Sequence, residues 1–166
     1  MHSEMVRILL ARDLRALARE VDAYPNDELV WRTVPGISNS AGTLVLHVAG
    51  NLEHFIGAVL GRTGYVRDRD AEFSTRDLTR AELRGRIEAA TKSVDATLAQ
   101  LAPEQCEAEY PVPIGGRKVG TAAFLVHLAT HLAYHLGQID YHRRMLVPNA
   151  GTVDAMSIGK LPEYAP

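Results

Sequence analysis

The sequence predicts an all-α protein that folds as a four-helix bundle. Apolar residues recur at three- and four-residue steps over four segments of similar length, which is the pattern of helices that each bury one face. No internal repeat or low-complexity tract competes with this interpretation. The 166 residues correspond to one domain, and a chain of this size buries roughly 70% of its extended surface on folding. The bundle is therefore expected to fold alone.

The first helix is expected over residues 3–23, where the buried face consists of Val6, Leu9, Leu10, Leu14, Leu17 and Val21. Residues 25–36 interrupt the pattern with Pro, Asn and Gly, and we expect a connection there that carries the single tryptophan, Trp31. Residues 38–40 supply N-cap chemistry for a second helix over 40–61. Its apolar stripe contains Leu44, Val48, Phe55 and Val59.

Residues 62–77 are polar and lack helical periodicity, so we expect a loop. Such a loop spans about 50 Å when extended, longer than a helix of about 33 Å. The second and third helices are therefore expected to run parallel, which gives an up-down-down-up order. The third helix is expected over 79–101, because Thr79 and Glu82 form a capping box and apolar residues follow at helical steps.

Residues 110–119 are predicted to be extended around a tight turn at Gly115 and Gly116. Thr121 is expected to cap a fourth helix over 121–147, which ends before Pro148. The bundle thus occupies residues 1–147. Residues 148–166 are predicted to form an extended tail along the surface or across a partner. Homodimerisation is plausible because the tail carries apolar residues able to cover a second copy: Ile158, Leu161 and Tyr164.

Composition excludes several classes of function. A formal charge of -2 leaves no basic surplus for a phosphate backbone, so nucleic-acid binding is disfavoured. No uninterrupted apolar run approaches the roughly 20 residues of a membrane span. The single cysteine, Cys106, cannot form an intramolecular disulfide, and no apolar leader opens the chain. We therefore expect a cytoplasmic protein, with Cys106 in a loop as neither nucleophile nor ligand.

Histidine spacing in the fourth helix indicates a metal site. His127, His131 and His135 are each four residues apart, and residues at this spacing project from one helix face about 6 Å apart along the axis. His131 and His135 lie on the apolar stripe, where a buried polar group needs a partner. The second helix places His47 and Asn51 on its own apolar face. If the two faces meet, His47 completes a three-nitrogen set with His131 and His135.

Three neutral imidazoles suit zinc, nickel, copper or iron, and they leave coordination positions open for water or substrate. The competing interpretation is that these histidines are hydrogen-bonded core residues, and the spacing alone does not decide between the two. Gln138, one turn beyond His135, is expected to hold a ligand ring, to contact substrate or to bond another helix. Asn51 has the same set of roles.

The other histidines point less clearly to a function. His54 and His127 are either a pair behind the ligands or two unrelated polar core residues. His2 is assigned to the terminus and His142 to a cation at the helix C-terminus, where the dipole favours it. Tyr134 and Tyr141 are expected to be packing or rim residues. The solvated end of the helix is expected to contain Asp140, Arg143 and Arg144.

Taken together, these strings resemble the DinB-like and YfiT-like superfamily of four-helix-bundle metalloproteins. The resemblance covers nearly the whole chain and rests on GTLVLHVAGNLEHFIG, DRDAEF, LTRAELRGRIEAA and, above all, HLATHLAYHLGQIDYHRRML. The family's ligand triad, one histidine plus the two of an HxxxHxGQ pattern, falls on His47, His131 and His135, with Gln138 in the glutamine position. The pattern often has Arg after the last histidine, where this chain has Leu136, and this departure puts in doubt an anion contact there.

The resemblance implies a metal-dependent enzyme that transfers a low-molecular-weight thiol, such as mycothiol or bacillithiol, to a small electrophile or isomerises that substrate. A divalent ion, zinc or nickel in the first instance, would lower the pKa of a bound thiol or water. The activity would be that of a thiol S-transferase or a hydrolase-like enzyme, with no side chain identified as general base. The alternative is a metal-binding stress-response or interaction module without turnover.

Overall fold

Long helices dominate the chain, as the apolar periodicity predicts. The structure is a computed structural model that describes residues 2–156 and 158–160. Four long helical segments carry the fold: α1 (His2–Asp22), α3 (Ala41–Leu52) continued by the π-helix η1 (Glu53–Leu60), α5 (Arg80–Gln100) and α7 (Thr121–Leu146). Short helices lie between and after them: α2 (Asp27–Trp31), α4 (Arg69–Ser74), α6 (Pro103–Glu107) and the 3-10 turn η2 (Ile158–Lys160). The prediction of an all-α protein is confirmed, because the described residues contain no strand.

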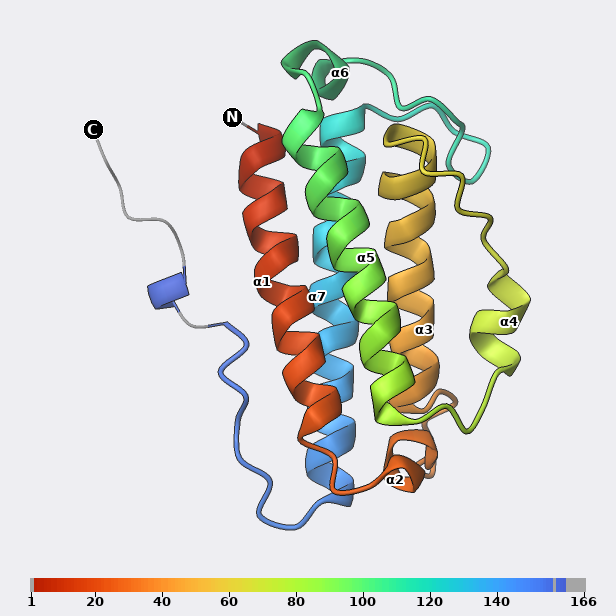
Figure 1. Cartoon of the computed structure of the whole chain (residues 1–166), viewed down its shortest axis with the longest axis vertical. Coiled ribbons are helices and arrows are strands. Elements are labelled where there is room, and N and C mark those ends of the chain that lie inside the picture. The colour runs from red at the N-terminus through yellow and green to blue at the C-terminus, as the bar shows by residue number, and fades with distance from the viewer. Residues whose placement is uncertain (1, 157, 161–166) are drawn as a thin grey trace.

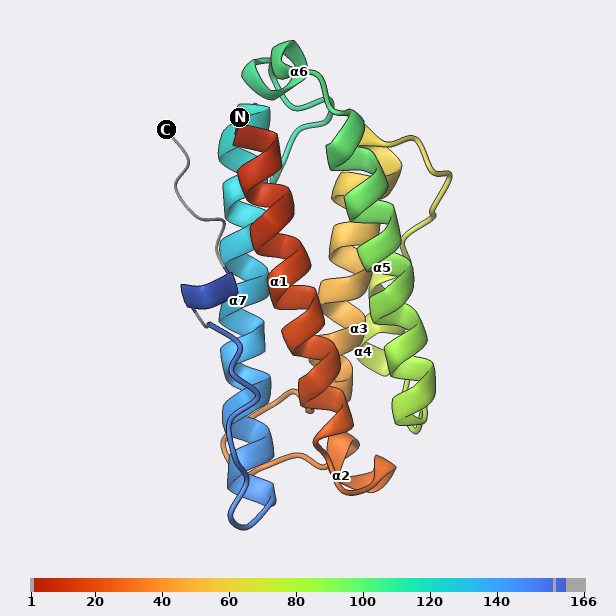
Figure 2. The same cartoon turned by 60° about the vertical axis from the view of Figure 1, so that its left-hand side comes forward.

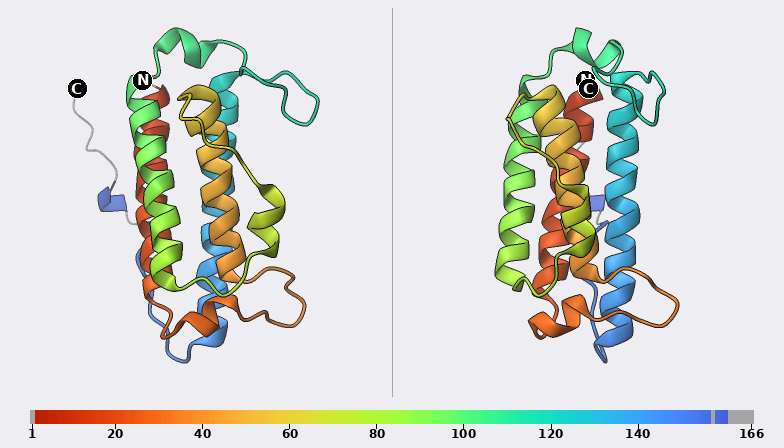
Figure 3. Two further views of the ribbon diagram at one scale, coloured as in Figure 1. Left: turned by 45° about the vertical axis from the view of Figure 1, so that its right-hand side comes forward. Right: turned by 90° about the vertical axis from the view of Figure 1, so that its right-hand side faces the viewer.

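The long helices pack side by side around one apolar core (Figure 1). α1 contacts α5 and α7, and α3 contacts the same two helices. α1 and α7 run in one direction, whereas α3 and α5 run in the other (Figures 1 and 2). The segment between η1 and α5, which contains α4, returns along α3 (Figure 3). α3 and α7 are therefore antiparallel neighbours, and side chains of both can meet at one level.

Two short helices lie in stretches that were predicted as connections. Asn26 caps α2 by accepting a hydrogen bond from the Leu29 amide, and Asp68 caps α4 through the Ala71 amide at 2.8 Å. Capping by Asn and Asp side chains is a common helix start. Helices of five and six residues are too short to show apolar periodicity, so the prediction of loops was wrong there. Likewise Cys106 is buried in α6 rather than placed in a loop.

The second predicted helix changes to a π-helical pattern over η1. Gly57 in η1 and Gly61 directly after it lie against the side chains of Ser93 and Thr97 in α5, and a Cβ atom at either glycine would clash with them. Glycine thus permits a close approach of the two helices at this end of the core. Residues 41–60 are long and apolar enough to cross a membrane, contrary to expectation, but 67% of that window is buried, as in a core helix.

Three expectations about α7 were wrong. Thr121 does not cap the helix, because Gly120 is the N-cap and Thr121 is buried with its amide bonded to the Ala108 carbonyl. His142 is not a helix-end cation: it is 2% exposed, its Nε2 donates to the Arg32 carbonyl at 2.7 Å, and its Nδ1 accepts from the Tyr24 hydroxyl. Burial lowers the pKa of His142, so it is neutral at pH 7.

Arg143 is also buried rather than solvated. Its Nε lies 2.5 Å from Oε2 of Glu20 in α1, and both side chains are almost fully buried. It also donates to the Gly151 carbonyl at 2.8 Å, which ties the start of the tail to the bundle. Asp140 and Arg144 form an ion pair at 2.9 Å nearer the surface.

The described part of the tail lies on the chain's own bundle (Figure 2). Arg19 of α1 donates to the Val153 carbonyl at 3.2 Å, and Arg12 reaches the sulfur of Met156. Ile158 is 81% exposed, whereas Leu161 and Tyr164 lie outside the described residues. The tail therefore packs along the surface as far as Met156.

Candidate metal centre

Three histidines from two helices converge between α3 and α7. The Nε2 atoms of His131 and His135 are 3.1 Å apart, and those of His47 and His131 are 3.4 Å apart. One ligand nitrogen from each residue lies within 4.8 Å of the others. His131 and His135 share a face of α7 because four residues advance the helix by just over one turn. The structure thus brings together the three residues that the sequence selects.

Two hydrogen-bond acceptors fix which ring nitrogens carry a proton. Oε2 of Glu72 lies 3.0 Å from His47 Nδ1, and Oε1 of Gln138 lies 2.7 Å from His135 Nδ1. A carboxylate and an amide oxygen only accept, so both Nδ1 atoms donate and both Nε2 atoms present a lone pair to the centre. Metal-ligating histidines are oriented in this way by their other nitrogen. Gln138 therefore holds the ring of His135, one of the three candidate ligands.

Burial keeps the triad uncharged. It lowers the pKa of His131 to about 4, and the neighbouring imidazoles of His135 and His47 act in the same direction. Burial also lowers the pKa of His47, against the effect of Glu72, and that of His135, against the bond from Gln138. Neutral imidazole is the form that binds a metal ion. At pH 7 all three rings are therefore ready to act as ligands.

The arrangement fits a divalent transition ion. A tetrahedral ion with bonds of 2.0–2.1 Å sets its nitrogen ligands about 3.3 Å apart, close to the 3.1 and 3.4 Å separations found here. Without a cation, the Nε2 lone pairs of His47 and His135 both face His131 Nε2, whose single N–H satisfies only one of them. Among the described residues, the group contains three ligand side chains and no fourth. The donor set is that of a site with positions left open.

The histidine of α3 is supported by residues that the sequence reasoning missed. Glu72 in α4 is 5% exposed and is held by Arg67, whose Nε and second terminal nitrogen donate to its two oxygens at 2.6 and 2.8 Å. The Phe73 ring lies 5.0 Å from the His47 ring. The signal available in the sequence was the string DRDAEF, which carries Glu72 and Phe73 within a polar stretch.

The remaining candidates lie outside the triad. Asn51 is buried, but its Oδ1 has no hydrogen-bond partner among the described residues, so no contact with a ligand ring is found. His54 packs on Phe55, with a buried Nδ1 that lacks a described partner. His127 is exposed and stacks on Phe124 and His131 at 5.8 and 6.1 Å. No described contact pairs His54 with His127, and His127 is not a core residue.

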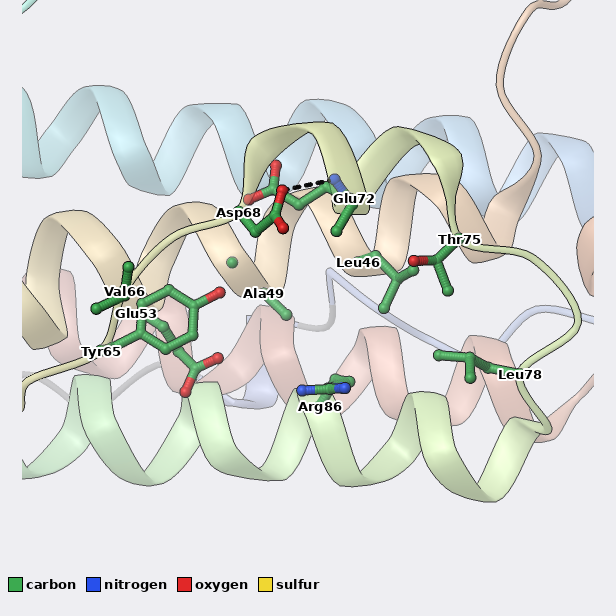
Figure 4. Close-up of a pocket in the computed structure, with 12 residues that line it drawn as sticks. Leu46, Ala49, Glu53, Tyr65, Val66, Asp68, Glu72, Thr75, Leu78 and Arg86 are labelled. Carbon is green, nitrogen blue, oxygen red and sulfur yellow. Dashed lines mark hydrogen bonds between the residues drawn. The ribbon is translucent and has the colours of Figure 1, made fainter.

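Two hollows border the centre. A groove of about 790 Å³ runs along α7 from His135 and Gln138 toward Met145. A smaller cavity of about 240 Å³ lies between α3, the segment around α4, and α5 (Figure 4). Glu72 forms part of its wall, together with Glu53 and Arg86, but none of the three histidines does. Hydrogen bonds, rather than dense packing on every side, therefore hold the Glu72 carboxylate in place.

Comparison with known proteins gives one family and one fold. A family model described as the DinB superfamily matches residues 9–139. The crystal structure of a DinB-like protein from Bacillus subtilis superposes with a TM-score of 0.62 at 20% identity, over 86% of this chain and 92% of that one. A DinB-like protein from Bacillus cereus ATCC 10987 gives 0.63 at 16% identity, over 85% and 90%. No curated protein sequence matches the chain.

Proposed function

The chain belongs to the DinB superfamily, and from that premise we propose that it is a metal-dependent enzyme acting on a small electrophilic substrate. His47, His131 and His135 would hold one divalent ion, zinc or nickel in the first instance. The reaction would be transfer of a low-molecular-weight thiol to the substrate, or isomerisation of the substrate. We also propose that the scaffold is a four-helix bundle in up-down-down-up order, as the directions of the four long helical segments indicate (Figure 1).

One observation carries the proposal: three Nε2 atoms converge beside a groove that opens along α7. A purely structural site is commonly closed by a fourth protein ligand, whereas a catalytic site keeps a position for water or substrate. His135 and Gln138 belong both to the centre and to the lining of the groove. The groove therefore meets the triad at the His135 ring, whereas His47 and His131 do not line it.

The chain's own residues orient the site rather than move protons. Glu72 and Gln138 hold two ligand rings with their Nε2 atoms inward, and Arg67 fixes the Glu72 carboxylate so that it does not rotate away from His47. A bound ion would supply a Lewis acid that lowers the pKa of a thiol or water and polarises an electrophile. Neutral imidazoles leave the charge of that ion uncompensated, which favours an anionic thiolate.

The test is metal content and thiol consumption measured on the same preparations. Wild type, His47→Ala and the matched control His54→Gln are loaded with Zn²⁺ or Ni²⁺, and elemental analysis gives the metal per chain. We expect one ion per chain in the wild type and the control, and loss of the ion in His47→Ala. Each protein is then given bacillithiol or mycothiol together with each member of a panel of electrophiles. We expect thiol consumption by the metal-loaded wild type and His54→Gln, and none by His47→Ala.

The two outcomes against the proposal differ. Unchanged metal content in His47→Ala would refute the site. A bound ion without thiol consumption against any electrophile would refute the enzyme and leave a metal-binding module. Cytoplasmic location and homodimerisation are further parts of the proposal, to be measured by fractionation and by sedimentation.

A further inference from the structure

The groove beside the triad has a clear position in the fold. One wall is the connection between α2 and α3, from Gly36 to Asn39, and the other is α7 from Tyr134 to Met145. The connection projects beside the lower part of α3 and α7 in both views of Figure 3. The volume of about 790 Å³ lies within the range of about 300–1,000 Å³ of small-molecule sites. His135 and Gln138 form part of its lining.

The lining of the groove carries no fixed charge. It contains no Asp, Glu, Lys or Arg among the described residues. His142 is the one imidazole besides His135 among the described lining residues. Both of its nitrogens are bonded inside the protein, and burial keeps it neutral. A charged ligand would therefore lose its hydration in this groove without gaining an opposite charge.

Large side chains with apolar surface are exposed on the α7 wall of the groove. Tyr134, Tyr141 and Met145 are 65%, 70% and 51% exposed, and they project from one stretch of α7. No hydrogen bond of either tyrosine hydroxyl is found among the described contacts. An exposed cluster of this kind next to a candidate site marks a binding surface, and tyrosine rings supply apolar contact area at low conformational cost.

Positive charges near the triad come from a different element. Arg67 and Arg69 lie in or beside α4, and both act on the pKa of His47. Neither lines the groove. Arg67 is paired with Glu72, and the same segment carries Asp68 and Asp70, so the α4 side holds charges of both signs, whereas the groove is uncharged. The groove, which offers no charge to an anionic thiol, suits the uncharged substrate instead.

We infer that the groove between residues 36–39 and α7 binds an uncharged, aromatic or otherwise apolar group of the electrophilic substrate, which it directs at the triad. The inference rests on the proposed function, because it assigns a substrate class to that same site. Tyr141 and Met145 would contact the apolar group, and His135 marks the end of the groove nearest the triad. The continuity of the groove with His135 is what selects a small ligand as its occupant.

The experiment compares three probes on zinc-loaded protein: imidazole, 4-phenylimidazole and 4-(imidazol-4-yl)benzoate. Isothermal titration gives each affinity in wild type, in Tyr141→Ala and in the matched control Val126→Ala. Val126 is 53% exposed on the same helix and does not line the groove. We expect the phenyl group to raise the affinity over imidazole about tenfold in wild type and in the control, from burial of apolar area.

In Tyr141→Ala the advantage of the phenyl group falls to about threefold or less, while imidazole affinity and zinc content stay unchanged. The carboxylate of the third probe abolishes the advantage in wild type. Equal affinity of wild type for imidazole and 4-phenylimidazole would overturn the inference, as would tighter binding of the benzoate. Loss of zinc, or no binding of imidazole, would instead refute the metal site itself, so the two failures are distinguishable.

Discussion

Substitution of Gly50 by Ala tests how closely the Glu72 carboxylate is held against α3. A Cβ atom at Gly50 would lie closer than 3.0 Å to Glu72 Oε1, a separation that real Cβ atoms essentially never show, and 3.2 Å from the Tyr65 hydroxyl. The Glu72 carboxylate must therefore move. A shift of roughly 1 Å is enough to lengthen the 3.0 Å bond between His47 Nδ1 and Glu72 beyond hydrogen-bond distance.

The magnitude follows from two opposed effects. Replacement of glycine by alanine inside a helix stabilises it by about 0.5–1 kcal/mol, whereas loss of a buried hydrogen bond to a charged group costs about 1.5–3 kcal/mol. We expect a net loss of about 1–2 kcal/mol in the free energy of unfolding of the metal-free protein. Loss of the carboxylate behind a ligand ring lowers metal affinity about 10- to 100-fold.

The assay is competition for Zn²⁺ against a chromophoric chelator, together with urea unfolding of the metal-free protein. Gly85→Ala is the matched control, because Gly85 lies in α5 with nothing within 4 Å of the added atom. It should gain about 0.5–1 kcal/mol in stability and keep the wild-type affinity for zinc. Wild-type zinc affinity in Gly50→Ala would refute the argument that Glu72, held by its contact with Gly50, positions His47.

Three further outcomes are expected. The metal-free protein should become less stable as pH falls from about 6.5 toward 4. The reason is that the pKa of His131 is lowered to about 4 in the folded protein, so the unfolded chain binds more protons than the folded one in this range. A melting temperature that stays constant from pH 7 to 5 would contradict this. Arg143→Met should cost about 3–5 kcal/mol in urea unfolding by leaving Glu20 buried without its partner, and Glu20→Gln in the same chain should recover part of the loss. Gly42→Ala should displace the Trp31 ring, because the ring lies 2.8 Å from the position of the added Cβ. We expect the free energy of unfolding to fall by about 1–3 kcal/mol and the tryptophan emission maximum to shift. An unchanged emission spectrum would refute the contact.

The long helices were predictable because each buries a face whose apolar residues repeat at helical spacing over many turns. The short helices α2 and α4 were not, since their positions depend on single caps, Asn26 and Asp68, and on what they pack against. The close approach of η1 to α5 at Gly57 likewise involves a partner distant in the sequence, Ser93. Features set by neighbouring elements leave little trace in local periodicity.

The same distinction applies to the candidate centre. His131 and His135 share one helix, so their spacing alone placed them together, and His47 followed from the apolar face of its own helix. Glu72 reaches His47 across 25 residues of chain, and Arg143 reaches Glu20 across 123. Such partners are determined by tertiary packing, which is why Glu72 was missed and Arg143 was expected in solvent.

X-ray absorption at the zinc edge tests the central claim most directly. In the zinc-loaded wild type we expect three imidazole nitrogens at about 2.0–2.1 Å and at least one further light atom that the protein does not supply. His47→Ala, loaded at high zinc concentration, should show no more than two imidazoles. A spectrum with sulfur neighbours, or with the same number of imidazoles in both proteins, would contradict the assignment of the ion to these three histidines.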